Sequence, residues 1–160
     1  MTAPAPPRDR LRTHDPGLPD DVLDLVCALA CRPTAELVDL AEFTLPKPYG
    51  ANHVLRSGGE HGLSFACFRP GQGSSLHYHR TRREVFYVRT GMLTLRTGDT
   101  WRHLDAGGCG ISTPGVPHAL RNDGAGPLEV LEVFTPALLD DKVRVEDSYA
   151  RALGPVGRHQ

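Results

Sequence analysis

Two histidines separated by a single residue, His77 and His79, constrain this chain more than any other feature. They lead into the run EVFYVRT (84–90), whose β-branched and aromatic residues predict a strand. Residues i and i+2 of a strand share a face, so we expect the two imidazoles to point the same way. Glu84 begins the following strand, from which its carboxylate can approach the same point. Imidazole nitrogens and a carboxylate oxygen suit a divalent first-row metal.

A third histidine, His118, follows the turn TPGVP (113–117), which is rich in proline and glycine. Such a turn fixes the direction in which the next strand begins. His118 is therefore the natural fourth ligand beside His77, His79 and Glu84. A six-coordinate metal with four protein ligands would keep about two positions for water, substrate or dioxygen.

These two stretches resemble the paired motifs of the cupin superfamily. The first motif, G-x5-H-x-H-x4-E-x6-G, matches at every defined position from Gly71 to Gly91. The second, G-x5-P-x-G-x2-H-x3-N, matches from Gly107 to Asn122 except at Thr113, where the family usually has proline. The resemblance implies an all-β fold, a double-stranded β-helix or jelly-roll cupin barrel whose interior holds the metal.

A wider resemblance, over residues 47–151, is to the cupin domain of bifunctional mannose-6-phosphate isomerase/GDP-mannose pyrophosphorylase proteins. It rests on four segments: KPYG (47–50), RPGQGSSLHYHR (69–80), PLEVLEVFTP (127–136) and DDKVRVEDSYAR (140–151). It implies a cavity in which a metal orients sugar oxygens while an acid/base moves a proton between adjacent carbons. The chain departs from that family in having His77 for a glutamine and Val85-Phe86 for a His-Trp pair.

Two further residues are candidate catalytic groups, Glu132 and Arg82. Glu132 shares a strand face with three apolar residues, Leu128, Val130 and Phe134. If this face points inward, Glu132 can serve as general acid or base; if it points outward near the rim, the acid is solvated. Arg82 belongs to the basic turn RTRR (80–83), where it either clamps a carboxylate or phosphate of a substrate or lies in a solvated loop.

The remaining segments predict how the chain is organised around the barrel. Residues 1–18 carry few large apolar side chains, which predicts a flexible N-terminal arm. Residues 19–45 are expected to form a helical extension, because PDDVLDLVCALACR has acidic residues in its first turn and a proline after its end. Short strands broken by glycine place the cupin barrel at 46–152, and 153–160 are expected to be a disordered tail.

Composition narrows the possible partners. A formal net charge of -1 gives no general attraction to nucleic acid or to an anionic membrane. No apolar run approaches the roughly 20 residues that cross a bilayer, and the start of the chain lacks the apolar segment of a signal peptide. We therefore expect a cytoplasmic protein with free thiols and a small-molecule substrate. Exposed barrel edges are often covered by a second subunit, so we also expect a homodimer.

Three functions fit these residues. The first is a metal-dependent enzyme acting on a small polar metabolite, similar to sugar or sugar-phosphate isomerases and epimerases. The second is an Fe(II)-dependent cupin dioxygenase, and the third is a non-catalytic module that binds or senses a small ligand. The ligand set suits Fe, Mn, Zn or Ni without deciding among them. The other histidines are expected to be exposed: His14, His53, His61, His103 and His159.

Overall fold

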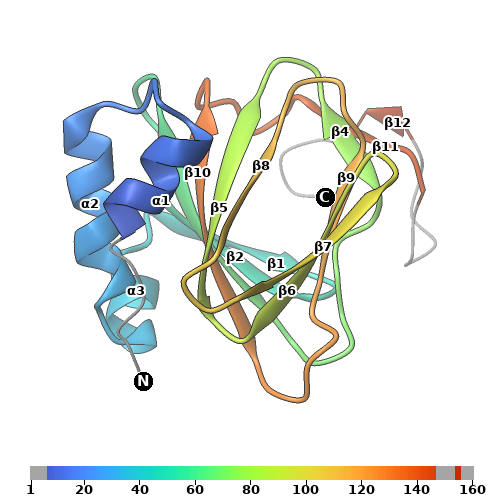
Figure 1. Ribbon diagram of the computed structural model, residues 1–160, viewed down its shortest axis with the longest axis horizontal. Coiled ribbons are helices and arrows are strands. Elements are labelled where there is room, and N and C mark those ends of the chain that lie inside the picture. Colours follow the sequence, from blue (N-terminus) through green and yellow to red (C-terminus); the bar gives the residue numbers. More distant parts are fainter. Residues whose placement is uncertain (1–6, 147–153, 156–160) are drawn as a thin grey trace.

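The structure of the protein is a computed structural model that describes residues 7–146 and 154–155. Two antiparallel sheets face each other, and helices cover the outer face of one of them (Figure 1). The predicted all-β jelly-roll barrel with short N-terminal helices is confirmed. No helix within these ranges is long and apolar enough to cross a membrane.

The first sheet, called here the helix-covered sheet, has six strands. Its order is β1 (Phe43–Lys47), β2 (Gly50–Arg56), β3 (Gly62–Phe68), β10 (Leu128–Thr135), β5 (Arg83–Thr90) and β8 (Cys109–Ser112). The second sheet, called the open sheet, has the order β12 (Gly154–Pro155), β11 (Lys142–Arg144), β4 (His77–His79), β9 (His118–Arg121), β6 (Met92–Thr97) and β7 (Thr100–Asp105).

From β4 onward the chain passes repeatedly between the two sheets, which is the winding of a double-stranded β-helix. Tight glycine turns make these passages possible. Gly91, between β5 and β6, has φ +86°, and a Cβ added there would lie 2.5 Å from the Pro127 carbonyl oxygen. Only glycine adopts this conformation without strain and allows so close an approach. A Gly-Asp turn at 98–99 joins β6 and β7.

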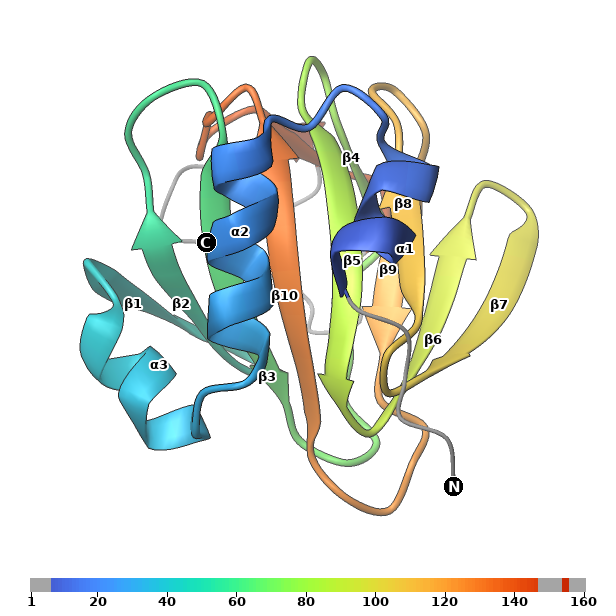
Figure 2. The same ribbon diagram turned by 60° about the vertical axis from the view of Figure 1, so that its left-hand side comes forward.

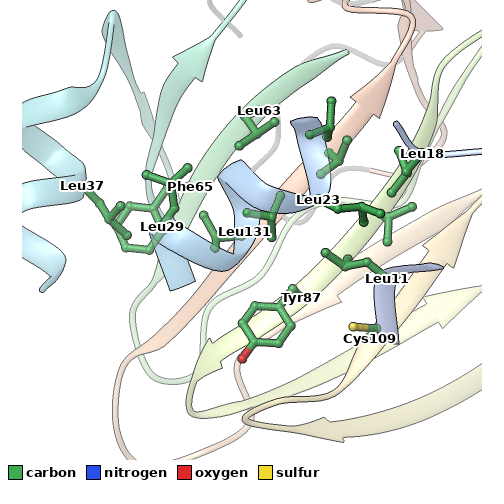
Figure 3. Packing of buried hydrophobic residues seen from close by; sticks show 14 residues of the cluster. Leu11, Leu18, Leu23, Leu29, Leu37, Leu63, Phe65, Tyr87, Cys109 and Leu131 are labelled. Carbon is green, nitrogen blue, oxygen red and sulfur yellow. The ribbon is translucent and has the colours of Figure 1, made fainter. Parts of the chain in front are cut away.

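The helix-covered sheet is buried on both faces, which explains why β10 reads as a nearly continuous apolar run. Leu128 and Val130 face the barrel interior, where they join a cluster with Phe86 and Leu95. Leu131 and Val133 face outward and pack against the helices, together with the residues shown in Figure 3. Sheet and helices thus share a second apolar core outside the barrel.

The N-terminal segment supplies one side of this outer core. The sequence favoured a flexible arm over residues 1–18, but the structure has helix α1 (Pro7–His14), with Leu11 fully buried and Leu18 4% exposed. A segment with so few apolar residues cannot fold alone, yet here Leu11 and Leu18 pack into the core between the helices and the sheet. Residues 1–6 lie outside the described part of the chain.

Two more helices complete the cover. Helix α2 (Asp20–Ala30) buries Val22, Leu23, Val26 and Leu29 against the helix-covered sheet (Figure 2). Residues 34–40, which periodicity could not assign to helix or strand, form helix α3 (Thr34–Leu40). The edge strand β1 follows directly. Of the tail expected to be disordered, 153–160, only Gly154–Pro155 are described, and they pair with β11.

Candidate metal centre

The three motif histidines meet between the two sheets. His77 and His79 project from the same face of β4, and His77 lies opposite His118 in the pairing of β4 with β9. One nitrogen from each ring lies within 4.8 Å of the corresponding nitrogens of the other two, and all three residues are buried. The period-two alternation of a strand and the antiparallel register together produce this convergence.

The outer nitrogen of each ring has hydrogen-bonding partners that orient the imidazole. The Nδ1 atoms lie 2.6 Å from the Ser75 carbonyl oxygen for His77, 3.0 Å from Asp141 Oδ1 for His79, and 3.1 Å from the Val116 carbonyl oxygen for His118. Carbonyl and carboxylate oxygens can only accept, so the Nδ1 atoms of His77 and His79 carry a proton and donate. His118 Nδ1 also lies 2.8 Å from Ser112 Oγ, which can accept the same proton as the Val116 carbonyl oxygen. The Nε2 lone pairs are left for the space where the rings meet. Metal-binding histidines are commonly oriented by such outer hydrogen bonds.

Two observations test whether these side chains fit a metal ion. Among the described residues, His118 Nε2 is a buried atom without a hydrogen-bond partner, and its nearest recorded charged neighbour is Glu84 Oε1 at 3.8 Å. His79 Nε2 is in direct contact with Glu84 Oε1. A nitrogen lone pair and a carboxylate oxygen are both acceptors, so their contact requires a proton or a cation between them. The donor set therefore fits a divalent metal.

Electrostatics at the same place favour an ionised Glu84. Burial alone would raise the pKa of Glu84, but Arg82 and His79 hold it well below its usual value. Burial opposes protonation of His79, yet Glu84 and Asp141 raise its pKa. Burial lowers the pKa of His118 to about 4 and that of His77 well below its usual value. Two imidazoles are thus neutral at physiological pH, as metal ligands must be.

Glu132 points inward, which answers the question that alternation left open. Its side chain lines the cavity beside the histidines and is 8% exposed, and Ser64 Oγ donates to its Oε2 at 3.3 Å. Desolvation, with a smaller contribution from the charge of Glu84, raises the pKa of Glu132 to about 7. A group with this pKa exchanges protons readily near neutral pH.

Arg82 is part of this site and is not a solvated loop residue. Its Nη2 donates to Glu84 Oε1 at 2.9 Å and lies 3.2 Å from His79 Nε2, while its Nη1 donates to the Leu138 carbonyl at 2.8 Å. The guanidinium also lies over the Phe134 ring, 4.6 Å from its centroid. Arg82 therefore holds the carboxylate of Glu84 toward the histidines and reaches the cavity wall.

The cavity that these residues line provides about 650 Å³ of free space, counted out to its open mouth. Its wall combines the polar residues above with Asn52, Ser74 and two lysines, and with an apolar side made by Leu45, Tyr49, Phe68, Leu120 and Leu139. Tyr49 and Phe68 stack with ring centroids 4.2 Å apart.

Sequence reasoning missed several polar residues of the site, among them Asp141, Lys142 and Lys47. Asp141 binds His79, and its Oδ2 also accepts from the backbone N–H groups of Thr81 and Arg82. Asp141 and Lys142 belong to the segment DDKVRVEDSYAR, in which β11 pairs with the histidine strand β4. The only signal in that segment is the pair Asp140 and Asp141, and nothing in the sequence indicates that Asp141 would bind His79.

The histidines outside the motifs do not all lie at the surface as expected. His53 and His61 are buried, and the Thr44 hydroxyl lies 2.8 Å from His53 Nδ1. His103 is exposed and His14 half-buried, while His159 lies outside the described residues. The four cysteines are free thiols, as the sequence predicted.

Comparison with known proteins gives the following relatives. Residues 64–134 match the family described as "Cupin domain". The chain is 34% identical over 107 residues to the xanthan biosynthesis protein XanB of Xanthomonas campestris pv. campestris, a segment that covers 66% of this chain and 23% of that protein. It is 29% identical over 107 residues to the mannose-1-phosphate guanylyltransferase ManC of Salmonella typhimurium, covering 66% and 22%. The chain thus spans less than a quarter of the length of these relatives.

A solved structure with a similar fold is an uncharacterised conserved protein with a double-stranded β-helix domain from Klebsiella pneumoniae. The TM-score is 0.58 at 21% sequence identity, over 72% of this chain and 96% of that one. At this identity the likeness establishes the fold, and it agrees with the winding described above.

Proposed function

Because this chain belongs to the cupin superfamily, we propose that it is a metal-dependent enzyme acting on a small polar metabolite. One observation carries the proposal: three buried imidazoles converge at the wall of a cavity that His77 and His79 line, and the same cavity contains an acid with a near-neutral pKa. A site for a structural metal would have no need of such an acid or of free space beside the ligands.

In this proposal His77, His79, His118 and Glu84 hold one divalent transition metal, Fe, Mn, Zn or Ni. When bound, such an ion acts as a Lewis acid that polarises a carbonyl or hydroxyl oxygen of the substrate. Arg82 keeps Glu84 ionised and oriented through the bonds at 3.1 and 2.9 Å. Ser64 and Glu132 lie on the opposite, helix-covered sheet, across from the histidine strands.

The reaction that best suits these groups is an isomerisation or epimerisation of a sugar or sugar phosphate. The Glu132 carboxylate would take a proton from the carbon next to a polarised carbonyl and return it to the former carbonyl carbon, while the hydroxyl proton passes to the former carbonyl oxygen. A pKa of about 7 makes both the acidic and the basic form available. The chain is similar to XanB and to ManC, and ManC is named mannose-1-phosphate guanylyltransferase. This similarity supports a sugar or a sugar phosphate as the substrate.

Metal analysis of purified variants tests the centre itself. We expect roughly one transition-metal ion per chain in the wild type and little in His77→Ala or His118→Ala, because each variant removes a ligand. His103→Ala changes an exposed histidine and serves as the control. Full metal occupancy in both ligand variants would refute the assignment.

Turnover measurements separate the three candidate functions. A panel of sugars and sugar phosphates is assayed with and without dioxygen. If the protein is an isomerase, it converts its substrate equally well without oxygen. In Glu132→Gln the rate of conversion should fall about 10²–10⁴-fold while the metal is retained. A three-histidine, one-carboxylate site with open positions is also compatible with an Fe(II)-dependent dioxygenase. Bound iron with substrate-dependent oxygen consumption would establish that alternative, and tight binding without turnover would indicate a sensing module.

We also propose that the protein is a cytoplasmic homodimer. Strand β7 is an edge of the open sheet, with Trp101 56% exposed on it. An exposed edge of this kind is commonly covered by a second subunit. Light scattering at increasing protein concentration tests the oligomeric state, and a monomer throughout would count against the proposal.

A further inference from the structure

The ion pair between Asp15 and Arg83 joins the N-terminal helices to the strand that carries Glu84. Asp15 follows α1, and its Oδ2 accepts from Arg83 Nε at 3.1 Å and lies 2.9 Å from Arg83 Nη2. The side chain of Asp15 is only 6% exposed, against 39% for that of Arg83. A carboxylate so deeply buried is costly unless its charge is paired, so the fold requires this partner.

The backbone around Asp15 holds its carboxylate in place. The Asp15 N–H donates to the Leu11 carbonyl at 2.8 Å, which extends the hydrogen bonding of α1 by one residue. Oδ1 of Asp15 accepts from the Gly17 N–H, and its carbonyl accepts from the Leu18 N–H, both at 3.2 Å. Leu11 and Leu18 anchor this turn in the outer core. The carboxylate is therefore fixed between α1 and α2.

Arg83 and Glu84 are the first two residues of β5, and their side chains lie on opposite faces of the sheet. On the outer face Arg83 binds Asp15. On the inner face Glu84 contacts His79 and accepts from Arg82. The start of β5 is thus held from both sides. A rotation of the strand at Arg83 is transmitted to Glu84, because adjacent residues share one planar peptide unit.

The first helix also lies against the strand that supports a second ligand. Helix α1 contacts β5 and β8 from the outer side of the helix-covered sheet (Figure 2). Ser112 of β8 pairs with Glu84 across the sheet, and its hydroxyl oxygen lies 2.8 Å from His118 Nδ1. The helix therefore backs both the strand from which Glu84 projects and the strand that orients His118.

From these contacts we infer that Asp15 is a positioning residue of the metal centre, which holds the Glu84 carboxylate toward the histidines through Arg83. The inference rests on the proposed function, because it takes Glu84 as a metal ligand. It gives the N-terminal helices a role beyond stability, since they keep the ligands in the geometry that a metal ion requires. Loss of the Asp15 charge should then weaken metal binding although every ligand is retained.

Competition against a fluorescent chelator, with Co²⁺ as the probe ion, tests this role. We expect Asp15→Asn and Arg83→Gln each to weaken Co²⁺ binding about 3–10-fold, because a residue bonded directly to a metal-binding histidine contributes about 10–100-fold and Asp15 acts through one residue more. The double variant should bind no more weakly than the weaker single variant, since both substitutions remove the same ion pair. Additive losses would overturn the inference.

Two control variants separate this effect from a general loosening of the helices. Arg89→Ala removes the arginine that joins α2 to the far end of β5, and it leaves Arg83 in place. Asp20→Asn removes an exposed acid of α2 that pairs with Arg8. Both variants should bind Co²⁺ as the wild type does. A loss in Arg89→Ala equal to that in Asp15→Asn would overturn the inference.

The visible absorption of bound Co²⁺ gives a readout that a purely stabilising role would not change. Its bands report the geometry of the ligands around the ion. They are recorded at saturating Co²⁺, so that every protein has the same occupancy. We expect shifted bands in Asp15→Asn and unshifted bands in Arg89→Ala. Identical spectra in both variants and the wild type would show that the ligand geometry does not depend on Asp15, which contradicts the inference.

Hydrogen exchange in the metal-free protein separates this inference from the proposed function. Asp15→Asn should speed exchange at the start of β5 several-fold, and Asp20→Asn should leave it unchanged. If the wild type binds Co²⁺ while Asp15→Asn alters neither exchange nor affinity, the positioning role is wrong and the metal centre stands. If exchange is faster in Asp15→Asn and the wild type binds no metal, the hold of Asp15 on the Glu84 strand stands and the proposed function is wrong.

Discussion

Asp141 Oδ1 accepts a hydrogen bond from His79 Nδ1 at 3.0 Å and so ties the C-terminal segment to the histidine cluster. The other carboxylate oxygen accepts from the N–H groups of Thr81 and Arg82 at 3.1 and 2.9 Å. A single residue therefore orients one imidazole and fixes the turn that carries Arg82. These bonds hold the pKa of Asp141 well below its usual value, although burial alone would raise it.

We expect Asp141→Asn to weaken metal binding about 10–100-fold, because the carboxylate that fixes the His79 tautomer is lost while the side-chain volume is kept. Competition against a fluorescent chelator measures the affinity. Asp140→Asn changes the exposed neighbouring residue and should leave the affinity unaltered. Equal affinities for the two variants would mean that Asp141 has no orienting role.

Glu132 should make the stability of the metal-free protein depend on pH. Its pKa is about 7 in the fold, against about 4.3 for an unfolded glutamate. Between these values the folded protein binds more protons than the unfolded one, so the contribution of Glu132 is complete at low pH and is lost as the pH rises toward 7.

Glu132→Gln mimics the protonated acid and should therefore match the wild type near pH 4 and exceed it by about 1–3 kcal/mol at pH 8. Urea denaturation of chelator-treated protein at several pH values gives this difference. Glu60→Gln, at an exposed position, is the control. Parallel curves for Glu132→Gln and the wild type would show that the side chain is solvated.

Arg89 joins the helices to the barrel. Its Nη1 donates to the carbonyl oxygens of Leu29 and Arg32 at 3.0 and 2.7 Å, at the end of α2, and its Nε lies 3.6 Å from Glu129 Oε2. Arg89→Ala would leave the Leu29 carbonyl and the buried Glu129 carboxylate without this cationic partner, at a cost of about 2–4 kcal/mol. Hydrogen exchange should show the loss concentrated in 20–40.

The matched control for this prediction is Arg32→Ala. It removes the side chain of an exposed ion pair with Glu36 and keeps the backbone carbonyl that Arg89 uses. Such pairs contribute less than about 1 kcal/mol, so the control should remain close to the wild type. If Arg89→Ala loses no more stability than the control, Arg89 does not hold the helices to the barrel.

Leu11 tests whether α1 belongs to the folded unit. It is fully buried in the outer core, so Leu11→Ala should lower the free energy of unfolding by about 2–5 kcal/mol. Leu40→Ala, at a position 51% exposed, should change it by less than about 0.5 kcal/mol. If both substitutions are neutral in chemical denaturation, the first 18 residues are the flexible arm that their composition suggested.

Much of the site could be predicted from the sequence because strand alternation is a local property. The spacing of His77 and His79 puts both rings on one face, and the same parity puts Glu84 inside and Tyr87 under the helices, as the structure has them. Glycine and proline turns located the strands that carry the third histidine. Alternation could not tell which face of β10 points into the barrel. It therefore could not decide whether Glu132 is buried in the cavity or solvated near the rim.

The sequence by itself determined the strand pattern, the barrel and the set of three imidazoles and one carboxylate. Only the tertiary structure decided that Asp141 supports His79 across 62 positions of chain, that Lys142 enters the cavity, and that α1 is buried. Periodicity reports how neighbours along one element are arranged. The order of strands in a sheet and the burial of its faces decide which distant segment covers a given face. Both depend on contacts between residues far apart in the chain, and no local pattern encodes such contacts.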